Sequence, residues 1–362
     1  AAFSQGEIPD VMNYQPGHPA YKRTWNDIIA AAEEFNDPGE FTTLIAYEWT
    51  SLVNGNNLHR NVIFRDGKDK TGQVEPYTTT PPWGSPDPQD LWKWMQDYED
   101  TTGGNVLAIP HNGNLSNGWM FSLQDDFDNG APLTREYAEA RQKWERLYEA
   151  TQMKGDGESH PLLSAEDEFA DFETWDYGNL DASAFKTPEM LPGEYARSGL
   201  QRGLRLEAIL GANPYKFGLV GASDTHNSLT TSSDENFFGK FVSSEPNPER
   251  AEHVSKSFAD GTVALEGWQY ITSGLTAVWA EENSRTAIFD AMQRREVYAT
   301  TGPRIRVRFF GGWEFDQSDE HRRDLAHLGY YKGVPMGSNL AATPDGSSAP
   351  SFLVYALRDA RG

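Results

Sequence analysis

The stretch Phe217–Asn227, with the sequence FGLVGASDTHN, decides how the fold is interpreted. Its first part is a short apolar run of the kind found in a strand that is buried on both faces. Asp224 and His226 stand two residues apart, so on extended backbone they are expected to point to the same side. At the end of a buried strand, an acid and an imidazole can hold a divalent metal in the mouth of an α/β domain. The alternative is a strand end with a capping Asp224 and a surface His226.

Metal-type side chains also stand at the ends of other predicted strands. Glu48 follows the run 41–47, His59 stands at the head of the run 58–64, and His111 follows the run 105–110. Functional groups of α/β barrels collect on the loops after the strands, so we expect these side chains to converge with Asp224 and His226. Five such ligands suffice for a binuclear site in which Glu48 bridges two metals roughly 3.5–4 Å apart. Taken singly, Glu48 can instead pair with an arginine, and His59 can be a satisfied core histidine.

Composition restricts the classes of partner. The 362 residues carry a formal net charge of −23 and no cysteine. Without a basic stripe, nucleic acid is not an expected partner, and without a run of 18 apolar residues no membrane span is expected. An anionic small-molecule substrate is compatible with this charge, because bound metals can dominate the local field. Any metal must be held by His, Asp and Glu, and such mixed ligation suits Zn, Mn or Fe.

Strand patterns alternate with helical patterns through about residue 300, which predicts an α/β fold with a mostly parallel barrel or sheet. Thr24 is the expected N-cap of the first helix. Asp87 or Asp90 should cap another helix that ends at Gly103, and Ser284 a third. A Ser/Thr/Asn-rich loop over 228–244 is a candidate lid. Residues 1–310 are therefore predicted to form the main domain, and residues 311–362 a polar, turn-rich β extension. Its final strand, at 351–355, has no partner strand following it in the chain.

Four short motifs carry a resemblance to a known superfamily. Residues 46–50 (AYEWT), 58–61 (LHRN), 109–112 (IPHN) and 223–226 (SDTH) resemble the later metal motifs of the PHP (polymerase and histidinol phosphatase) superfamily. A narrower family inside it, DUF3604, is similar over nearly the whole chain. Four segments carry this second similarity: residues 154–161, 171–176, 274–280 and 296–304.

The resemblance implies a distorted (β/α)7-type barrel, a cluster of two or three divalent metal ions, and hydrolysis, typically of phosphoesters. It implies that Glu48 bridges metals, that His59 and His111 hold one of them, and that Asp224 holds a second. His226 would hold a metal near the ligands of the first strand. The family resemblance also favours a periplasmic or secreted location over the cytoplasm.

The chain departs from the superfamily pattern at its start. PHP proteins begin with a strand that ends in H-x-H and continue with a strand that ends in D-H. Neither motif occurs among the eight histidines of this sequence, and His18 does not replace them. We therefore expect an additional N-terminal segment of the same protein, carrying both motifs, to pack against this chain. The alternative is a defective metal site.

Further polar residues stand near the predicted site. Asp156 and His160 lie on a Gly-rich loop after a predicted strand, where they can bind substrate, protonate a leaving group or order the turn. Lys154, Arg60 and Arg304 can bind an anionic oxygen or form salt bridges within this acidic chain. We assign candidate catalytic roles to Asp156, His160 and Arg60, and candidate substrate-binding roles to Lys154, Asn112 and Arg304.

These residues together predict a metal-dependent hydrolase whose nucleophile is a metal-activated water, acting on phosphomonoesters or phosphodiesters. One alternative is an amide or ester hydrolase of the amidohydrolase type, because the same ligands polarise a carbonyl as readily as a phosphoryl group. Another is a non-catalytic binding module in which a closed ligand shell makes the metal structural.

Overall fold

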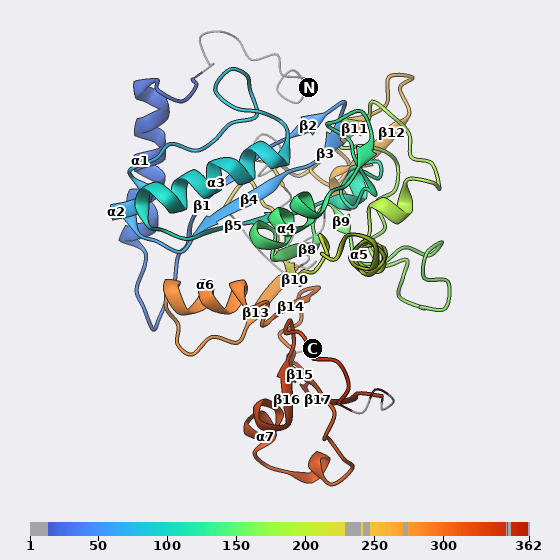
Figure 1. Ribbon diagram of the computed structural model, residues 1–362. Helices are drawn as coiled ribbons and strands as arrows, with labels where there is room; N and C mark the ends of the chain where they lie inside the picture. Colours follow the sequence, from blue (N-terminus) through green and yellow to red (C-terminus); the bar gives the residue numbers. More distant parts are fainter. Residues whose placement is uncertain are drawn as a thin grey trace.

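A three-stranded sheet in the order β1-β4-β5 organises the first half of the chain (Figure 1). The computed structural model describes residues 14–228, 240–241, 247–270, 274–344, 346 and 349–360. The sheet consists of β1 (Ile45–Trp49), β4 (Arg60–Phe64) and β5 (Val106–Pro110), and both pairings are antiparallel. Between β1 and β4 the chain makes only the ribbon of β2 (Leu52–Val53) and β3 (Asn56–Asn57), without a crossover helix, so β4 returns antiparallel to β1. For this sheet the prediction of mostly parallel strands is wrong.

The side chains of the first sheet alternate between two apolar layers. Val62 and Phe64 of β4 pack with the helix residues Trp25, Leu91 and others on one face. Ile63 packs on the other face, in the layer that contains Ile109 and Val220 of neighbouring strands. The helices that contribute to the first layer are α1 (Pro19–Glu34), α3 (Pro88–Thr102) and α4 (Arg135–Trp144), and α2 (Lys68–Thr71) lies beside α1.

The ends of the helices follow local capping chemistry. Asp87 Oδ1 accepts from the Gln89 backbone N–H at 2.8 Å, and Gly103 ends α3 with a φ of 63°, so both predictions are confirmed. Ser284 caps α6 (Arg285–Gln293), as predicted. The predicted cap Thr24 is wrong, because α1 begins earlier: Pro19 suits the first helical position, and His18 Nδ1 accepts from the Ala20 N–H at 3.1 Å.

A second sheet in the order β10-β8-β9 lies beside β5. Its strands are β8 (Leu147–Gln152), β9 (Gly155–Asp156) and β10 (Gly218–Gly221), and β8 and β10 are parallel. The helix α5 (Ala196–Leu210) is part of the long connection between β8 and β10. A parallel bridge between His111 and Glu149 joins this sheet to the end of β5. The hydrogen bonds between the described strands form several small sheets and do not join them into one closed sheet. The (β/α)7-type barrel therefore remains a prediction.

The last strands form a separate small sheet at the lower end of Figure 1. Its order is β16-β15-β17, and α7 (Leu325–Lys332) packs against it. β15 (Arg306–Gly312) pairs along its length with β17 (Ser351–Leu357) and at its end with β16 (Gly333–Pro335). The predicted boundary at 310/311 therefore falls inside β15, and the last strand pairs with β15, which precedes it in the chain.

Shorter elements cover the remaining described chain. Antiparallel pairs are formed by β6 (Gln124–Asp125) with β7 (Ala131–Pro132), β11 (Val254–Ser257) with β12 (Val263–Glu266), and β13 (Leu275–Val278) with β14 (Val297–Thr300). The 3-10 helices are η3 (Gly113–Leu115), η4 (Leu191–Gly193), η6 (Gly267–Gln269) and η7 (Asp319–His321).

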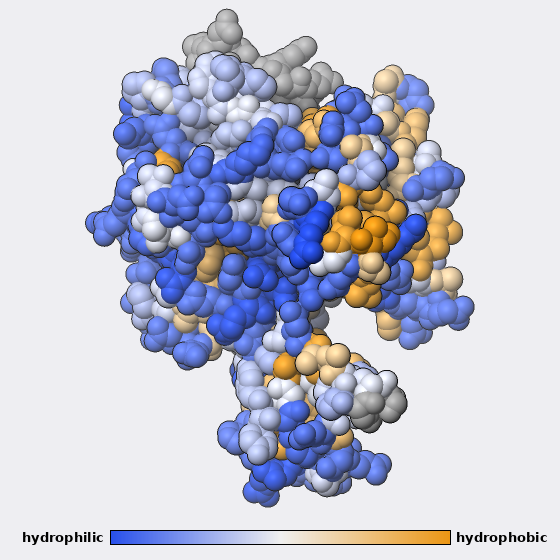
Figure 2. All heavy atoms as spheres, viewed as in Figure 1, coloured by the Kyte–Doolittle hydropathy of each residue, from blue (hydrophilic) through white to orange (hydrophobic). Residues whose placement is uncertain are grey.

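The visible surface is mainly hydrophilic, with an apolar area over α5 (Figure 2). Among the described helices, none combines the length and the apolar character that crossing a membrane requires. Of the predicted lid over 228–244, only residues 228, 240 and 241 belong to the described part of the chain.

Candidate metal centre

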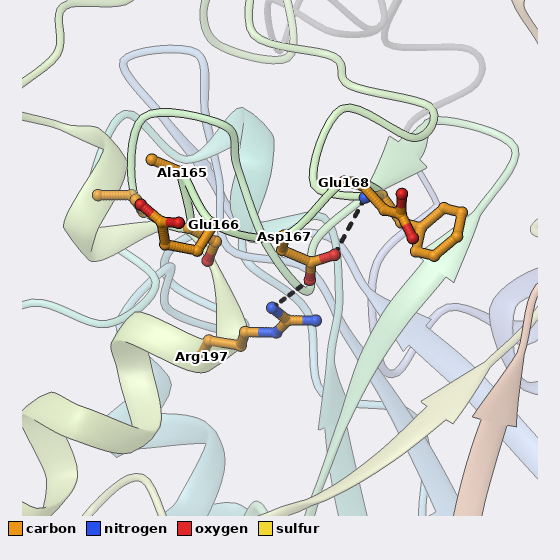
Figure 3. A pocket seen from close by; sticks show the side chains of 8 residues that line it. Ala165, Glu166, Asp167, Glu168 and Arg197 are labelled. Carbon is orange, nitrogen blue, oxygen red and sulfur yellow. Dashed lines mark hydrogen bonds and ion pairs between the residues drawn. The ribbon is translucent and has the colours of Figure 1, made fainter.

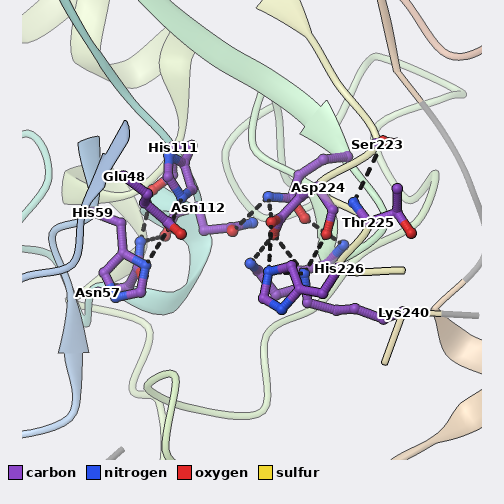
Figure 4. A network of polar contacts seen from close by, with 12 residues as sticks. Glu48, Asn57, His59, His111, Asn112, Ser223, Asp224, Thr225, His226 and Lys240 are labelled. Atoms are coloured by element: carbon purple, nitrogen blue, oxygen red, sulfur yellow. Dashed lines mark hydrogen bonds and ion pairs between the residues drawn. The ribbon is translucent and has the colours of Figure 1, made fainter. Parts of the chain in front are cut away.

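Glu48, His59 and His111 meet at one edge of the first sheet (Figure 4). Glu48 lies near the end of β1, His59 directly precedes β4, and His111 directly follows β5. Glu48 Oε1 lies 2.9 Å from His59 Nδ1 and 2.9 Å from His111 Nε2. One ligand atom of each residue lies within 4.8 Å of the others, and these three residues are the one such group found among the described residues. The predicted convergence of these three side chains is therefore confirmed.

Neighbouring amides hold His111 in place. Asn57 Nδ2 donates to the backbone oxygen of His111 at 2.7 Å, and Asn61 Nδ2 lies 3.5 Å from His111 Nδ1. His111 is 1 % exposed, and its ring meets that of His59 edge to face at 5.7 Å. The Asn57 contact therefore holds the backbone that carries His111, and the Asn61 amide lies beside the ring nitrogen that does not face Glu48.

The electrostatics of the group keep a carboxylate and a neutral imidazole available. Burial raises the pKa of Glu48, but the hydrogen bonds and charges of His111 and His59 lower it more, so its pKa lies well below the ordinary value. Burial lowers the pKa of His59, which favours the neutral ring with a free lone pair. For His111 burial acts in the same direction, but the Glu48 carboxylate outweighs it and the pKa is raised. Metal binding requires the neutral imidazole, so a proton competes with the metal at His111 and metal affinity should rise with pH.

Glu149 provides a test of whether a cation fits here. This residue of β8 is 4 % exposed, and its Oε1 has no hydrogen-bond partner within the described structure. The bridge with His111 places it beside the group of three, and burial raises its pKa. A buried carboxylate oxygen without a partner is costly, and a nearby cation would satisfy it. Two imidazoles and a carboxylate are also the donor set of open zinc sites, so the residues present fit a divalent metal.

Asp224 and His226 lie next to the group of three but do not join it. Asp224 Oδ2 accepts from Gln152 Nε2 at 2.8 Å and from Lys154 Nζ, and it forms an ion pair with Lys240 Nζ at 2.9 Å. Asp224 Oδ1 lies 3.2 Å from His226 Nε2. Burial raises the pKa of Asp224, but Lys154, His226 and Lys240 lower it more, to well below the ordinary value. The two side chains do meet, although β10 ends at Gly221 and Asp224 has a φ of 54°, so the expected extended backbone is wrong.

Lys154 and Asn112 lie in the site, where their predicted substrate-binding roles require them. Gln152 Nε2 donates to Asn112 Oδ1 and to Asp224 Oδ2, both at 2.8 Å, and so connects the two halves of the site. Lys154 is 6 % exposed, and its ammonium group pairs with Asp224. Among its charged neighbours are also Glu48 and Glu149.

Sequence reasoning missed two residues of this site, Glu149 and Lys240. Glu149 could have been found from the sequence, because it lies inside a predicted strand, and an acid that a strand buries usually has a partner or a function. Lys240 had none, since it follows a polar loop and reaches Asp224 only through the tertiary fold.

Arg60 is located in the core and not in the site. It belongs to the same face of β4 as Val62 and Phe64, opposite to Asn61. Its Nε donates to Glu145 Oε1 at 3.0 Å, and the side chain is 2 % exposed. The predicted catalytic role of Arg60 is corrected accordingly to a buried ion pair.

Arg304 is exposed and lies at the junction with the C-terminal sheet. Its backbone N–H donates to Asp359 Oδ2 at 2.6 Å. No contact recorded for the described residues joins it to Glu48, Asp224 or their neighbours, so the structure does not bring this predicted substrate-binding residue into the site.

Asp156 and His160 order the loop that carries them. Asp156 Oδ2 accepts from the backbone N–H groups of Glu158 and Ser159 at 3.0 and 3.1 Å. His160 Nδ1 accepts from the Leu162 N–H at 3.1 Å, and its Nε2 lies 3.3 Å from Asp176 Oδ2. Within the described structure, none of these contacts reaches the group of three. The geometry favours the structural alternative for this loop over the catalytic one.

Asp156 should make stability depend on pH. Burial raises its pKa from 3.8 to about 7, so the folded state keeps this proton to higher pH than the unfolded state. Stability is therefore lost as pH rises from about 4 to 7. Asp156→Asn cannot ionise and can still accept both backbone N–H groups. We expect it to match the wild type at pH 4 and to be about 4 kcal/mol more stable at pH 8, measured by urea unfolding.

The control for this experiment is Asp97→Asn on the exposed surface of α3, which should leave the pH profile of the wild type unchanged. Parallel profiles for the wild type and Asp156→Asn would contradict the raised pKa of Asp156. Turnover measured in the same variant separates the two interpretations of the loop, because a catalytic Asp156 would lose activity together with its proton.

A hollow on the surface is formed by residues 163–169 and Arg197 (Figure 3). Arg197 pairs there with Asp167 at 2.5 Å, and also with Glu158 at 2.9 Å. Asp167 Oδ1 accepts from the Phe169 N–H at 3.0 Å. None of the residues of the Glu48 group (Glu48, His59 and His111) lines this hollow. Arg197 and Asp167 neutralise each other, so the hollow has no candidate chemistry.

The fold and the site together define a mixed α/β protein with a candidate divalent-metal centre at the edge of its first sheet. The chain belongs to the DUF3604 family, described as "Protein of unknown function (DUF3604)", whose sequence profile matches residues 1–362. The resemblance to this family is thereby confirmed. A search of the curated proteins found no match, and a search of the solved structures found none either.

Proposed function

We propose that this protein is a metal-dependent hydrolase of the PHP superfamily and that phosphoesters are its substrates. The observation that carries the proposal is the group Glu48, His59 and His111, whose ligand atoms converge within 4.8 Å. A metal bound there would act as a Lewis acid and would lower the pKa of a bound water towards about 7. The superfamily relationship and the phosphoester class rest on the motif resemblance, and the metal site rests on the geometry.

The protein side chains divide the remaining tasks. Glu48 and the two imidazoles would hold the metal, and Asn57 would keep the His111 backbone in position through its 2.7 Å hydrogen bond. Glu149 can hold a proton on its unpartnered Oε1 beside His111, because burial raises its pKa. Lys154 offers an ammonium group to an anionic oxygen of the substrate.

A panel of chromogenic substrates tests this function. We expect p-nitrophenyl phosphate or bis-p-nitrophenyl phosphate to be hydrolysed in the presence of Zn²⁺, Mn²⁺ or Fe²⁺. Activity should fall to background after chelation and return when metal is restored. Hydrolysis of a p-nitrophenyl carboxyl ester or an anilide alone would instead support the amidohydrolase alternative.

The matched variant is Glu48→Gln, which keeps the size of the side chain and removes its charge. It should lose both metal and turnover. Tight metal binding by the wild-type protein without turnover of any substrate class would contradict the enzymatic proposal and favour the structural metal site.

A further inference from the structure

Asp224 has contacts that differ from those of a metal-binding carboxylate. Its Oδ2 accepts from the ammonium group of Lys154 and forms an ion pair with Lys240 Nζ at 2.9 Å. Lys240 Nζ also donates to the backbone oxygen of Asp224 and lies 3.2 Å from His226 Nε2. Both lysines are buried, with exposures of 6 % and 4 %. The position that the superfamily resemblance gives to a second metal is therefore surrounded by two cationic side chains.

A cation would be repelled at this position. A divalent ion bound to Asp224 Oδ2 would lie within a few ångströms of two ammonium groups, and Coulomb repulsion is strong where water is excluded. A metal that bound Asp224 would also have to displace both lysines from its carboxylate, which accepts a further hydrogen bond from Gln152 Nε2 at 2.8 Å. The donor set here, with one carboxylate and a half-exposed His226, does not fit a second metal in the way that the Glu48 group fits a first.

An anion, in contrast, would find donors at the same place. An ammonium group has three N–H donors, and Asp224 is the one acceptor recorded for Lys154 Nζ among the described residues. Asp224 is the carboxylate that both ammonium groups contact directly, whereas Glu48 acts on both lysines, and Glu149 on Lys154, only through space.

The lysine pair also lies close enough to the metal centre for one substrate to reach both. Gln152 bridges Asn112, next to His111, and Asp224 with two 2.8 Å hydrogen bonds. Figure 4 shows the Glu48 group and the Asp224 group side by side with Asn112 between them. Other charges act on Lys154 as well: Asp224, Glu48 and Glu149 favour its ammonium form.

We propose that Lys154 and Lys240, positioned by Asp224, form a subsite for an oxyanion such as a phosphoryl group, in place of a second metal. The inference rests on the proposed function for its substrate class, since phosphoester oxygens are the anions expected beside a catalytic metal. Lys154 binds the anion directly, and Asp224 is a positioning residue that holds both ammonium groups. The site then contains one metal, held by Glu48, His59 and His111.

Binding of inorganic phosphate to metal-loaded and chelated protein tests the subsite. Lys154→Met and Lys240→Met should each weaken phosphate binding by about 10-fold in calorimetry. Lys154→Met removes a charge-assisted hydrogen bond to the anion, and Lys240→Met removes the neighbouring positive charge. Lys93→Met removes an exposed lysine of α3 and should change nothing. Metal content should be the same in all four proteins. If a methionine variant fails to fold, the glutamine variant at the same position provides the measurement.

Metal stoichiometry from native mass spectrometry tests the other half of the proposal. The wild type should bind one metal, Asp224→Asn should keep it, and Glu48→Gln should lose it. A second metal that disappears in Asp224→Asn would overturn the proposal, and so would unchanged phosphate affinity in both lysine variants. Neither measurement needs turnover. Absence of hydrolysis with intact phosphate binding would therefore contradict the proposed function while leaving the subsite in place.

Discussion

His111→Ala should lower metal affinity by more than about 100-fold and reduce metal-dependent hydrolysis to background. Loss of a contact to a metal ligand already costs roughly 10–100-fold, and loss of the ligand itself costs more. His111 also shares Glu48 Oε1 with His59, so the remaining two ligands would lose part of their fixed geometry. Metal content after dialysis, measured by inductively coupled plasma mass spectrometry, checks the first effect, and turnover of the best phosphoester checks the second.

The matched control is His321→Ala, whose imidazole is 80 % exposed in the C-terminal part of the chain. It should retain metal and turnover. The fold should survive in His111→Ala, because the backbone of residue 111 keeps its hydrogen bonds to Asn57 and to the His59 backbone. Full metal content and normal turnover in His111→Ala would remove the basis for the metal centre.

The convergence of Glu48, His59 and His111 could be predicted from the sequence, although for a partly different reason. The prediction relied on loops after parallel strands. In the structure β4 runs antiparallel to both neighbours, so the start of β4 lies at the same edge as the ends of β1 and β5. His59, at the head of its strand, reaches the site for this reason. The apolar runs located all three strands, although the run 41–47 begins four residues before β1, which contains Glu48. The pattern is strongest for β5, which is buried along its whole length.

The surroundings of Asp224 could not be predicted in the same way. A carboxylate two residues from a histidine has the local pattern of a ligand pair, whether its neighbours in space are metals or lysines. The partners Lys154 and Lys240 come from distant parts of the chain, and sequence distance alone does not indicate such contacts. The direction of Arg60 was in principle predictable, since alternation along β4 places it opposite to Asn61.

Glu145→Ala should cause the largest loss of stability among the proposed variants, because it breaks a buried ion pair. Glu145 is 3 % exposed, and its Oε1 accepts from Arg60 Nε and from Trp92 Nε1, both at 3.0 Å. Its Oε2 forms an ion pair with Arg141 Nε at 2.9 Å. Glu145→Ala would leave two buried guanidinium groups without their counter-charge. We expect a loss of about 3–5 kcal/mol in the free energy of unfolding, measured by urea denaturation at pH 7.

The pH dependence and two further variants separate this role from catalysis. Burial raises the pKa of Glu145, but Arg60 and Arg141 lower it more, so its pKa in the folded state is depressed. The stabilisation is then present above the ordinary pKa of a glutamate and is lost as pH falls, which should shrink the difference between Glu145→Ala and wild type in acid. Glu139→Ala, which breaks an exposed pair with Arg135, should leave the free energy of unfolding nearly unchanged. Arg60→Met should destabilise the fold, while the protein that remains folded keeps normal turnover. If Arg60→Met instead folded stably but had no turnover, a catalytic role for Arg60 would be restored.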